Sequence, residues 1–288
     1  MIEFRNVSAE FDGKPVLQNI ELSVENGDFL ALCGGDTAGK TTLLHILMGF
    51  NTAYMGKVFI MGSRPNNLEA DKRAKVRFVP DDMIWEQQLT AEDYFALASE
   101  SAPTYDRVLQ EKLCKKYEVP IYNKMMRMSY KENKLVQIIS AISARPRLLI
   151  LDEPKNFLDK KSYSMLLEDL RQMNKTGTTI VMAVEKYSEV SAYCSHYAYL
   201  KEGKLVSAGR VSKRTRKCKI VTVRGGNTAF LEEHMERCIA ERRGEKVYLY
   251  KGDSQMLFLL LYKADCEDCI VEEMTLEEEL DRNFDRWL

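Results

Sequence analysis

The chain has 288 residues, 45% of them hydrophobic and 30% charged, with a formal net charge of −1. That length allows one large domain, or one domain and a small addition. The balanced charge argues against general nucleic-acid binding, which needs a basic excess to displace the counterions of phosphate. Residues 1–6 lack an apolar signal core, and no apolar run approaches the ~18 residues of a membrane span. We therefore expect a cytoplasmic chain that contacts a membrane only through a partner.

Seven cysteines are scattered along the chain, and their odd number fits reduced cytosolic thiols. Cys266 and Cys269 have the spacing of half a zinc site. No second cysteine pair and no histidine pair follows them. The pattern therefore favours two ordinary thiols near the start of a strand.

The first 25 residues alternate apolar and polar side chains, which predicts antiparallel strands broken at residues 12–13 and 25–27. An apolar run over 29–33 predicts a buried strand that enters a glycine-rich turn and then a helix over 41–50. Because strands then alternate with helices, we expect right-handed crossovers and a parallel central sheet. The further elements expected are strands at 56–61, 76–79, 148–151 and 178–183, a helix-rich stretch over about 90–144 and an amphipathic helix over 162–173.

The alternation closes near Gly209, and a basic run follows over residues 212–219. Such a run can bind lipid or nucleic acid, but a solvated connector is the favoured interpretation. We therefore divide the chain into domains 1–210 and 211–288, the second a small α/β extension. Its expected elements are strands at 219–223, 247–250 and 256–262, a helix over 228–242, and an acidic helix over 275–284 opened by a capping box at Thr275 and Glu278.

The strongest motif spans residues 34–41, Gly-Gly-Asp-Thr-Ala-Gly-Lys-Thr, a complete G-x-x-x-x-G-K-[ST] sequence. It lies directly after a predicted buried strand and opens a predicted helix, as its chemistry requires. Glycines let backbone N–H groups surround a phosphate, and the helix N-terminus adds positive charge. Lys40 is placed to reach the β- and γ-phosphates, and Thr41 to offer its hydroxyl to Mg²⁺. The motif therefore predicts binding of ATP with Mg²⁺.

Two acidic residues, Asp152 and Glu153, follow the apolar run 148–151. At the carboxyl edge of a parallel sheet, residues in this place face the ligand site. Asp152 suits the outer sphere of the Mg²⁺ ion, and Glu153 suits the polarising of an attacking water. Two ordinary acids at a strand end are the alternative.

Residues 151–159, Leu-Asp-Glu-Pro-Lys-Asn-Phe-Leu-Asp, resemble the Walker B motif and D-loop of ABC-type ATPases, usually LDEP-T-N-G-LD. Residues 11–17 resemble the segment whose aromatic ring stacks on adenine, which makes Phe11 the candidate; a half-buried strand residue is the alternative. The resemblance covers about residues 1–210. It implies an α/β P-loop NTPase fold of ABC type, with a parallel central sheet, an antiparallel β subdomain and a helical subdomain over about 88–144. The C-terminal extension resembles that of ABC-2 exporter ATPases.

The resemblance also implies the residues of the site. Nucleotide contacts are expected from Phe11, Gly34, Gly35, Asp36, Thr37, Ala38, Gly39, Lys40, Thr41, Thr42, Ser129 and Asp159, metal contacts from Thr41, Asp81 and Asp152, and catalytic roles from Asp81, Glu153 and Glu185.

The signature motif departs from the family pattern. It is usually LSGGQ, and here residues 128–132 are Met-Ser-Tyr-Lys-Glu, with only Ser129 retained. In the family this motif closes over ATP held by a second subunit, and glycine permits the close approach. Lys131 either blocks that closure or supplies a cation in its place. We favour impaired closure.

The Q-loop and the switch residue are also altered. Asp81 follows Val79-Pro80 where the family has glutamine; it can still ligate Mg²⁺ but is shorter and adds a negative charge. Glu185 aligns with the switch histidine and, when ionised, has no proton to donate. Like charges ~4 Å apart repel by roughly 4 kcal/mol at an effective dielectric of ~20, so Glu185 should turn away, pair with a lysine or take up a proton. Loss of one such donor commonly costs about 10²–10³ in rate.

We therefore expect an ATP-binding subunit that hydrolyses slowly and drives transport, export rather than import, through separate transmembrane permease subunits on the inner face of the membrane. A second ATPase subunit, identical or different, would complete the nucleotide sites. Ile84 and Trp85 lie in the segment 81–94, where permeases usually dock, and would suit that use if exposed; a role in the core is the equal alternative. The alternatives are a weakly catalytic regulatory subunit of an asymmetric pair and, less favoured, a soluble ABC ATPase acting on ribosomes or DNA. No nucleic-acid partner is expected.

Overall fold

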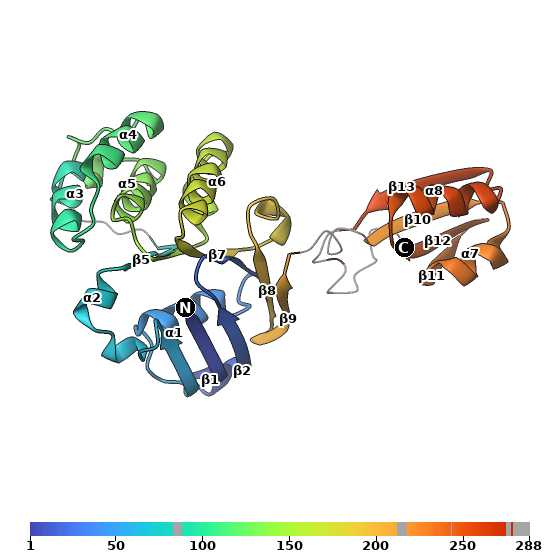
Figure 1. Cartoon of the computed structure of the whole chain (residues 1–288), viewed down its shortest axis with the longest axis horizontal. Helices are drawn as coiled ribbons and strands as arrows, with labels where there is room; N and C mark the ends of the chain where they lie inside the picture. The colour runs from blue at the N-terminus through green and yellow to red at the C-terminus, as the bar shows by residue number, and fades with distance from the viewer. Residues whose placement is uncertain (83–87, 212–217, 243, 275–277, 279–288) are drawn as a thin grey trace. The chain divides into compact units, whose positions relative to one another are not determined.

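The computed structural model describes residues 1–82, 88–211, 218–242, 244–274 and 278. The chain divides into two compact units, Met1–Arg210 and Val211–Leu288 (Figure 1). Within the described residues, every helix is too short or too polar to cross a lipid bilayer. The expected docking residues Ile84 and Trp85, most of the basic run and most of the expected acidic helix lie outside the described residues.

The N-terminal unit begins with a three-stranded antiparallel sheet in the order β2-β1-β4. Its strands are β1 (Ile2–Phe11), β2 (Lys14–Val24) and β4 (Met55–Ile60). Asp12 and Gly13, which both have positive φ, make the tight turn between β1 and β2 and confirm the predicted break there. The buried side chains of this sheet share one hydrophobic core with those of the central sheet.

A six-stranded sheet in the order β5-β6-β7-β3-β8-β9 forms the centre of this unit. Its neighbouring strands pair in parallel, except for an antiparallel hairpin at one edge, β8–β9. The predicted parallel sheet is confirmed, and the hairpin adds one strand to it. The strands are β3 (Phe29–Cys33), β5 (Val76–Val79), β6 (Leu148–Asp152), β7 (Thr179–Val184), β8 (His196–Lys201) and β9 (Lys204–Arg210).

Helices α1 (Lys40–Met48) and α6 (Lys160–Lys175) follow β3 and β6 along the chain. Helices α3 (Ala91–Glu100), α4 (Arg107–Tyr117) and α5 (Tyr130–Ser143) lie together in the green part of the unit (Figure 1). Each of these three begins at a side chain that accepts an N–H hydrogen bond from the first turn, namely Thr90, Asp106 and Ser129. The shorter helices described are α2 (Ala70–Arg73) and the 3₁₀ turns Pro65–Asn67, Met125–Arg127, Pro154–Phe157 and Tyr187–Glu189.

The C-terminal unit is a βαββαβ fold whose sheet has the order β11-β12-β10-β13, with antiparallel neighbours throughout. The α/β character was predicted, but two assignments were wrong. Residues 256–262 lie in a helix, because buried Leu257, Leu260 and Leu261 follow the helical period rather than alternating. The expected helix over 228–242 ends at His234 and gives way to a strand. The elements are β10 (Cys218–Arg224), α7 (Thr228–His234), β11 (Arg237–Arg242), β12 (Glu245–Lys251), α8 (Ser254–Lys263) and β13 (Asp268–Glu273).

Candidate nucleotide-binding site

The glycine-rich turn joins β3 to α1, as the sequence predicts. Gly39 occupies the N-cap of α1 with φ 101°, a left-handed conformation that suits glycine. A Cβ atom at Gly39 would lie 2.7 Å from Leu17 Cδ2 and 3.0 Å from Val16 O, so no side chain fits there. The turn therefore packs closely against β2 and directs the N-terminus of α1 toward the site.

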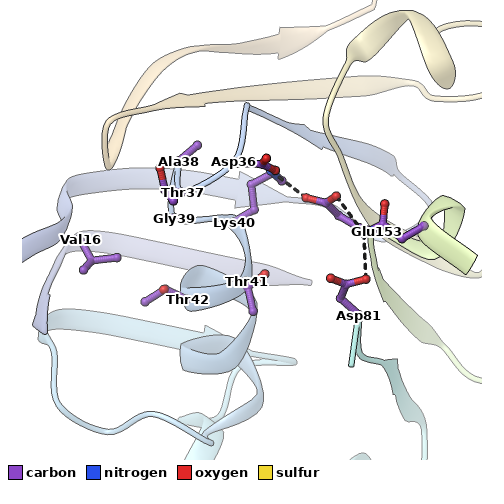
Figure 2. A pocket seen from close by; sticks show the side chains of 11 residues that line it. Val16, Asp36, Thr37, Ala38, Gly39, Lys40, Thr41, Thr42, Asp81 and Glu153 are labelled. Atoms are coloured by element: carbon purple, nitrogen blue, oxygen red, sulfur yellow. Dashed lines mark hydrogen bonds and ion pairs between the residues drawn. The ribbon is translucent and has the colours of Figure 1, made fainter. Parts of the chain in front are cut away.

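A cavity of about 380 Å³ opens beside this turn (Figure 2), within the usual size of a small-molecule pocket. Three segments that follow β3, β5 and β6 meet there: the turn with the start of α1, the residue after Pro80, and the residues just after Asp152; Val16 on β2 completes the lining. Parallel pairing brings these carboxyl ends to one edge of the sheet. Its lining residues are Val16, Asp36, Thr37, Ala38, Gly39, Lys40, Thr41, Thr42, Asp81, Glu153 and Asn156.

Most of the expected site residues line this cavity, and two unexpected ones join them. Val16 and Asn156 were not predicted as site residues, although Asn156 stands inside the motif at residues 151–159. Gly34 and Gly35 contribute backbone carbonyls to Lys40. The other expected contacts lie outside the lining, namely Phe11, Ser129, Asp152, Asp159 and Glu185.

Lys40 is the cation of the cavity wall and has only 4% of its surface exposed. Its Nζ donates to the carbonyls of Gly34 at 2.6 Å and Gly35 at 2.9 Å. The same nitrogen lies 2.9 Å from Glu153 Oε1, and Figure 2 shows the side chain reaching toward that carboxylate. A phosphate entering here would meet an ammonium already desolvated and held in position.

Asp152 ends β6 and is completely buried. Neither of its carboxylate oxygens has a hydrogen-bond partner of normal geometry among the described residues. Burial raises the pKa of Asp152, the charges of Asp81 and Glu153 raise it further, and the nearby Thr41 hydroxyl opposes them. Such a buried carboxylate, with only the Thr41 hydroxyl near it as a donor, fits a divalent cation that prefers oxygen ligands.

The residues present therefore fit Mg²⁺ held through Thr41, Asp81 and Asp152. The described residues contain no cluster of three acidic, histidine or cysteine side chains able to hold a metal by themselves. The remaining Mg²⁺ ligands would be phosphate oxygens and water, which is the usual arrangement for this ion.

We predict that Asp152→Asn stabilises the nucleotide-free protein against heat at pH 7. The raised pKa means that the folded state binds a proton more tightly than the unfolded chain, so stability falls as pH rises through the folded-state pKa. Asparagine removes this penalty. Thermal unfolding across pH measures it: the variant should unfold at a higher temperature near neutrality and at a similar one in acid. A lower unfolding temperature of Asp152→Asn at pH 7 would contradict the interpretation. The same variant should also lose part of the gain in ATP binding that Mg²⁺ provides.

Glu153 adopts a left-handed backbone conformation, φ 41° and ψ 53°, at the start of the turn Pro154–Phe157. Asn156 Nδ2 donates to Asp81 Oδ1 at 2.9 Å and approaches Glu153 Oε2 at 3.4 Å. The amide therefore bridges two of the three carboxylates that the sequence predicts to be catalytic, Asp81 and Glu153.

Glu185 follows β7 and is exposed to solvent. It lines a second cavity of about 250 Å³ together with Glu153 and Lys155. Among the described residues, Glu185 has no ion pair, and the Nζ of Lys155 in the same cavity pairs with Glu189 Oε1 at 2.9 Å. We expected Glu185 to turn away, to pair with a lysine or to take up a proton. Its side chain is exposed to solvent and forms no lysine pair within the described part of the chain.

The altered signature is tied to the D-loop of the same chain. Ser129 forms a capping box with Glu132 at the start of α5. Lys131 Nζ lies 2.5 Å from Asp159 Oδ2, and this ammonium, together with hydrogen bonds from Ser162, lowers the pKa of Asp159 to about 2. Tyr130 stacks on Phe157 with ring centroids 6.0 Å apart. Side chains thus occupy the space that glycines leave open in the family pattern.

The fold and the site together define a P-loop nucleoside triphosphatase: a phosphate-binding turn between β3 and α1 faces an acidic pair at the end of β6. Residues 17–156 match the family model described as ABC transporter. The N-terminal unit thus contains the domain that this model describes and has the fold of an ATP-binding cassette.

Solved structures agree on the fold. The chain is similar to an ATP-binding subunit of an ABC transporter, with a TM-score of 0.67 and 22% identity over 73% of this chain and 90% of the other. It is also similar to a dimeric ATP-binding cassette in a post-hydrolysis state bound to ADP and phosphate, with a TM-score of 0.64 and 22% identity over 74% of this chain and 99% of the other.

The relatives in sequence include importers and an exporter. The chain is 28% identical to the xylose import ATP-binding protein XylG of Thermoanaerobacter pseudethanolicus, over 72% of this chain and 43% of that protein. It is 25% identical to the Nod factor export ATP-binding protein I of Burkholderia lata, over 89% of this chain and 88% of that protein. The chain spans about half the length of the first import proteins that it matches.

Proposed function

We propose that this chain is the ATP-binding subunit of an ABC transporter, which binds ATP with Mg²⁺ and hydrolyses it slowly. The observation that carries this proposal is that Lys40 and Glu153 meet at one cavity, with the buried carboxylate of Asp152 next to Glu153 in the chain. A phosphate-binding cation, a metal-binding carboxylate and a carboxylate able to orient water are the parts that phosphoryl transfer to water requires.

In this mechanism the N–H groups of the turn and Lys40 bind the phosphates, and Thr41, Asp81 and Asp152 hold the metal. When bound, Mg²⁺ neutralises charge that develops on the phosphate oxygens. Glu153 orients the attacking water and accepts its proton, since Asn156 holds the carboxylate side chain at the cavity wall. Before that, Glu153 must release Lys40, with which it pairs at 2.9 Å.

Slow turnover follows from the altered motifs. Glu185 supplies no donor to the γ-phosphate, and Lys131 is held by Asp159 rather than free to approach a second nucleotide. Steady-state hydrolysis by the purified chain tests this proposal, with Glu153→Gln as the blank. Turnover as fast as that of ordinary transport ATPases would contradict it.

The partners that we propose are transmembrane permease subunits and a second ATPase subunit, so the chain would lie on the inner face of a membrane. A hollow of about 470 Å³, lined in part by Leu89, Tyr94 and Leu97, supports docking of a permease near α3. Export is favoured because the exporter's match extends over 268 residues, whereas the xylose importer's covers 218. Mass measurement of Glu153→Gln with and without ATP tests the ATPase pairing: a mass that ATP does not change would argue against an identical partner.

Adenine recognition is proposed for Phe11, which ends β1 with 71% of its surface exposed. Stacking of a base on an aromatic ring is worth ~1–3 kcal/mol, so Phe11→Ala should weaken ATP binding about tenfold. Binding of inorganic tripolyphosphate should not change, because that ligand has no base. Calorimetry measures both, with the exposed Tyr122→Ala as control. Equal losses for the two ligands would exclude stacking.

A second candidate function is a regulatory subunit that binds ATP without useful turnover in an asymmetric pair. The solvated Glu185 and the Lys131–Asp159 pair favour it. Retention of Glu153 in the cavity favours hydrolysis. Tight ATP binding with no turnover above the Glu153→Gln blank would identify the regulatory subunit.

A further inference from the structure

Lys134 lies in α5 with none of its surface exposed to solvent. Lysine is among the residues least often buried, because removing an ammonium from water is costly unless partners replace the lost hydration. A wholly buried lysine two residues after the altered signature therefore requires an explanation.

The ammonium group joins three segments of the N-terminal unit. Its Nζ donates to the carbonyls of Pro80 at 2.5 Å and Asp81 at 2.9 Å, just past β5. It also lies 5.1 Å from the ring centroid of Phe157, within the range of a cation–π contact. Burial lowers the pKa of Lys134, and the neighbouring aspartates, Asp81 foremost, act against that decrease.

The held backbone belongs to a residue whose side chain enters the nucleotide cavity. Asp81 Oδ1 accepts a hydrogen bond from Asn156, and Asn156 approaches Glu153, which in turn pairs with Lys40. A continuous line of contacts thus runs from α5 to the phosphate-binding turn. The backbone carbonyls that Lys134 binds therefore lie next to the carboxylate of Asp81 that lines the cavity.

We propose that Lys134 is a positioning residue for the metal side of the site: by holding the Pro80 and Asp81 carbonyls, it places the Asp81 carboxylate beside Asn156. This inference rests on the proposed function. Asp81 carries a negative charge that a glutamine would not carry, so it repels the carboxylates of Asp152 and Glu153. Lys134 opposes this repulsion in two ways: it holds the backbone at position 81 in place, and its ammonium adds a positive charge nearby.

The test compares ATP binding with and without Mg²⁺ by calorimetry. Lys134→Met keeps the length of the side chain and removes its donors. It should raise the Mg²⁺ concentration needed for half of the metal-dependent gain in ATP affinity by about 10–100-fold, the usual cost of losing a residue that orients a metal ligand. ATP binding without Mg²⁺ should stay within about twofold, since the phosphate-binding turn is intact. Lys134→Gln retains N–H donors, so its Mg²⁺ requirement should lie between those of Lys134→Met and the unaltered chain. Lys112 is exposed, and Lys112→Met should have the Mg²⁺ requirement of the unaltered chain.

A double-mutant cycle separates positioning from simple packing. If Lys134 acts through Asp81, Lys134→Met should change the Mg²⁺ requirement little in a chain that already carries Asp81→Ala. An additive effect, or an unchanged Mg²⁺ requirement in a destabilised Lys134→Met, would overturn the inference. Should Lys134→Met fail to fold, the comparison is made with Lys134→Gln. Failure of the unaltered chain to bind ATP would instead overturn the proposed function, so the two failures are distinguishable.

Discussion

Replacing Lys40 with alanine should weaken ATP binding by about 100-fold. The ammonium is buried and faces the cavity, so a bound triphosphate would contact it without further desolvation. A hydrogen bond to a charged group contributes ~1.5–3 kcal/mol, and each 1.4 kcal/mol is a factor of about ten in affinity. Removal also leaves the carbonyls of Gly34 and Gly35 without their donor, which loosens the turn.

Calorimetric titration with ATP measures this loss. Lys57→Ala is the matched control, since Lys57 is an exposed lysine on β4 that does not line the cavity. Circular dichroism and thermal unfolding establish that the Lys40→Ala chain is folded. If ATP bound as tightly to that folded variant as to the unaltered chain, the assignment of the cavity to a nucleotide would be wrong.

Replacing Glu153 with glutamine should reduce ATP hydrolysis by about 10²–10⁴-fold, the usual contribution of a general base. Glutamine has nearly the same shape and keeps the contact with Asn156 available, but it cannot accept a proton from water. ATP binding should be retained or strengthened, because the change removes a negative charge beside the phosphates and frees Lys40 from its ion pair.

Long incubations with radiolabelled ATP are needed to measure a slow enzyme and its slower variant. Glu189→Gln is the control. Glu189 lines the second cavity, which Glu153 also lines, but it pairs with Lys155 and does not line the nucleotide cavity. Its hydrolysis rate should remain within about threefold of the unaltered chain, since it touches no reacting atom. Equal rates for Glu153→Gln and the unaltered chain would remove Glu153 from the mechanism.

The phosphate-binding turn could be predicted from the sequence because all of its determinants are local. Residues 29–41 contain the buried strand, the glycines with their special backbone conformations and the first residues of the helix. The acidic pair at 152–153 is predictable for the same reason, since a fully apolar run must end at an edge of the buried sheet. Segment type was less certain where a short apolar run stood alone, as the helix α8 shows.

The amino-acid sequence alone determined which chemical groups this protein brings to a nucleotide: a lysine, a threonine hydroxyl and carboxylates at strand ends. Only the tertiary structure decided which of them meet. The strand order β5-β6-β7-β3-β8 brings Asp81 to Asn156, Glu153 to Lys40, and the Asp81 backbone to Lys134 on α5. These pairs lie from 53 to 113 positions apart, as 134 − 81 and 153 − 40 give. No local pattern encodes contacts over such separations, because they arise from the crossovers that order the sheet.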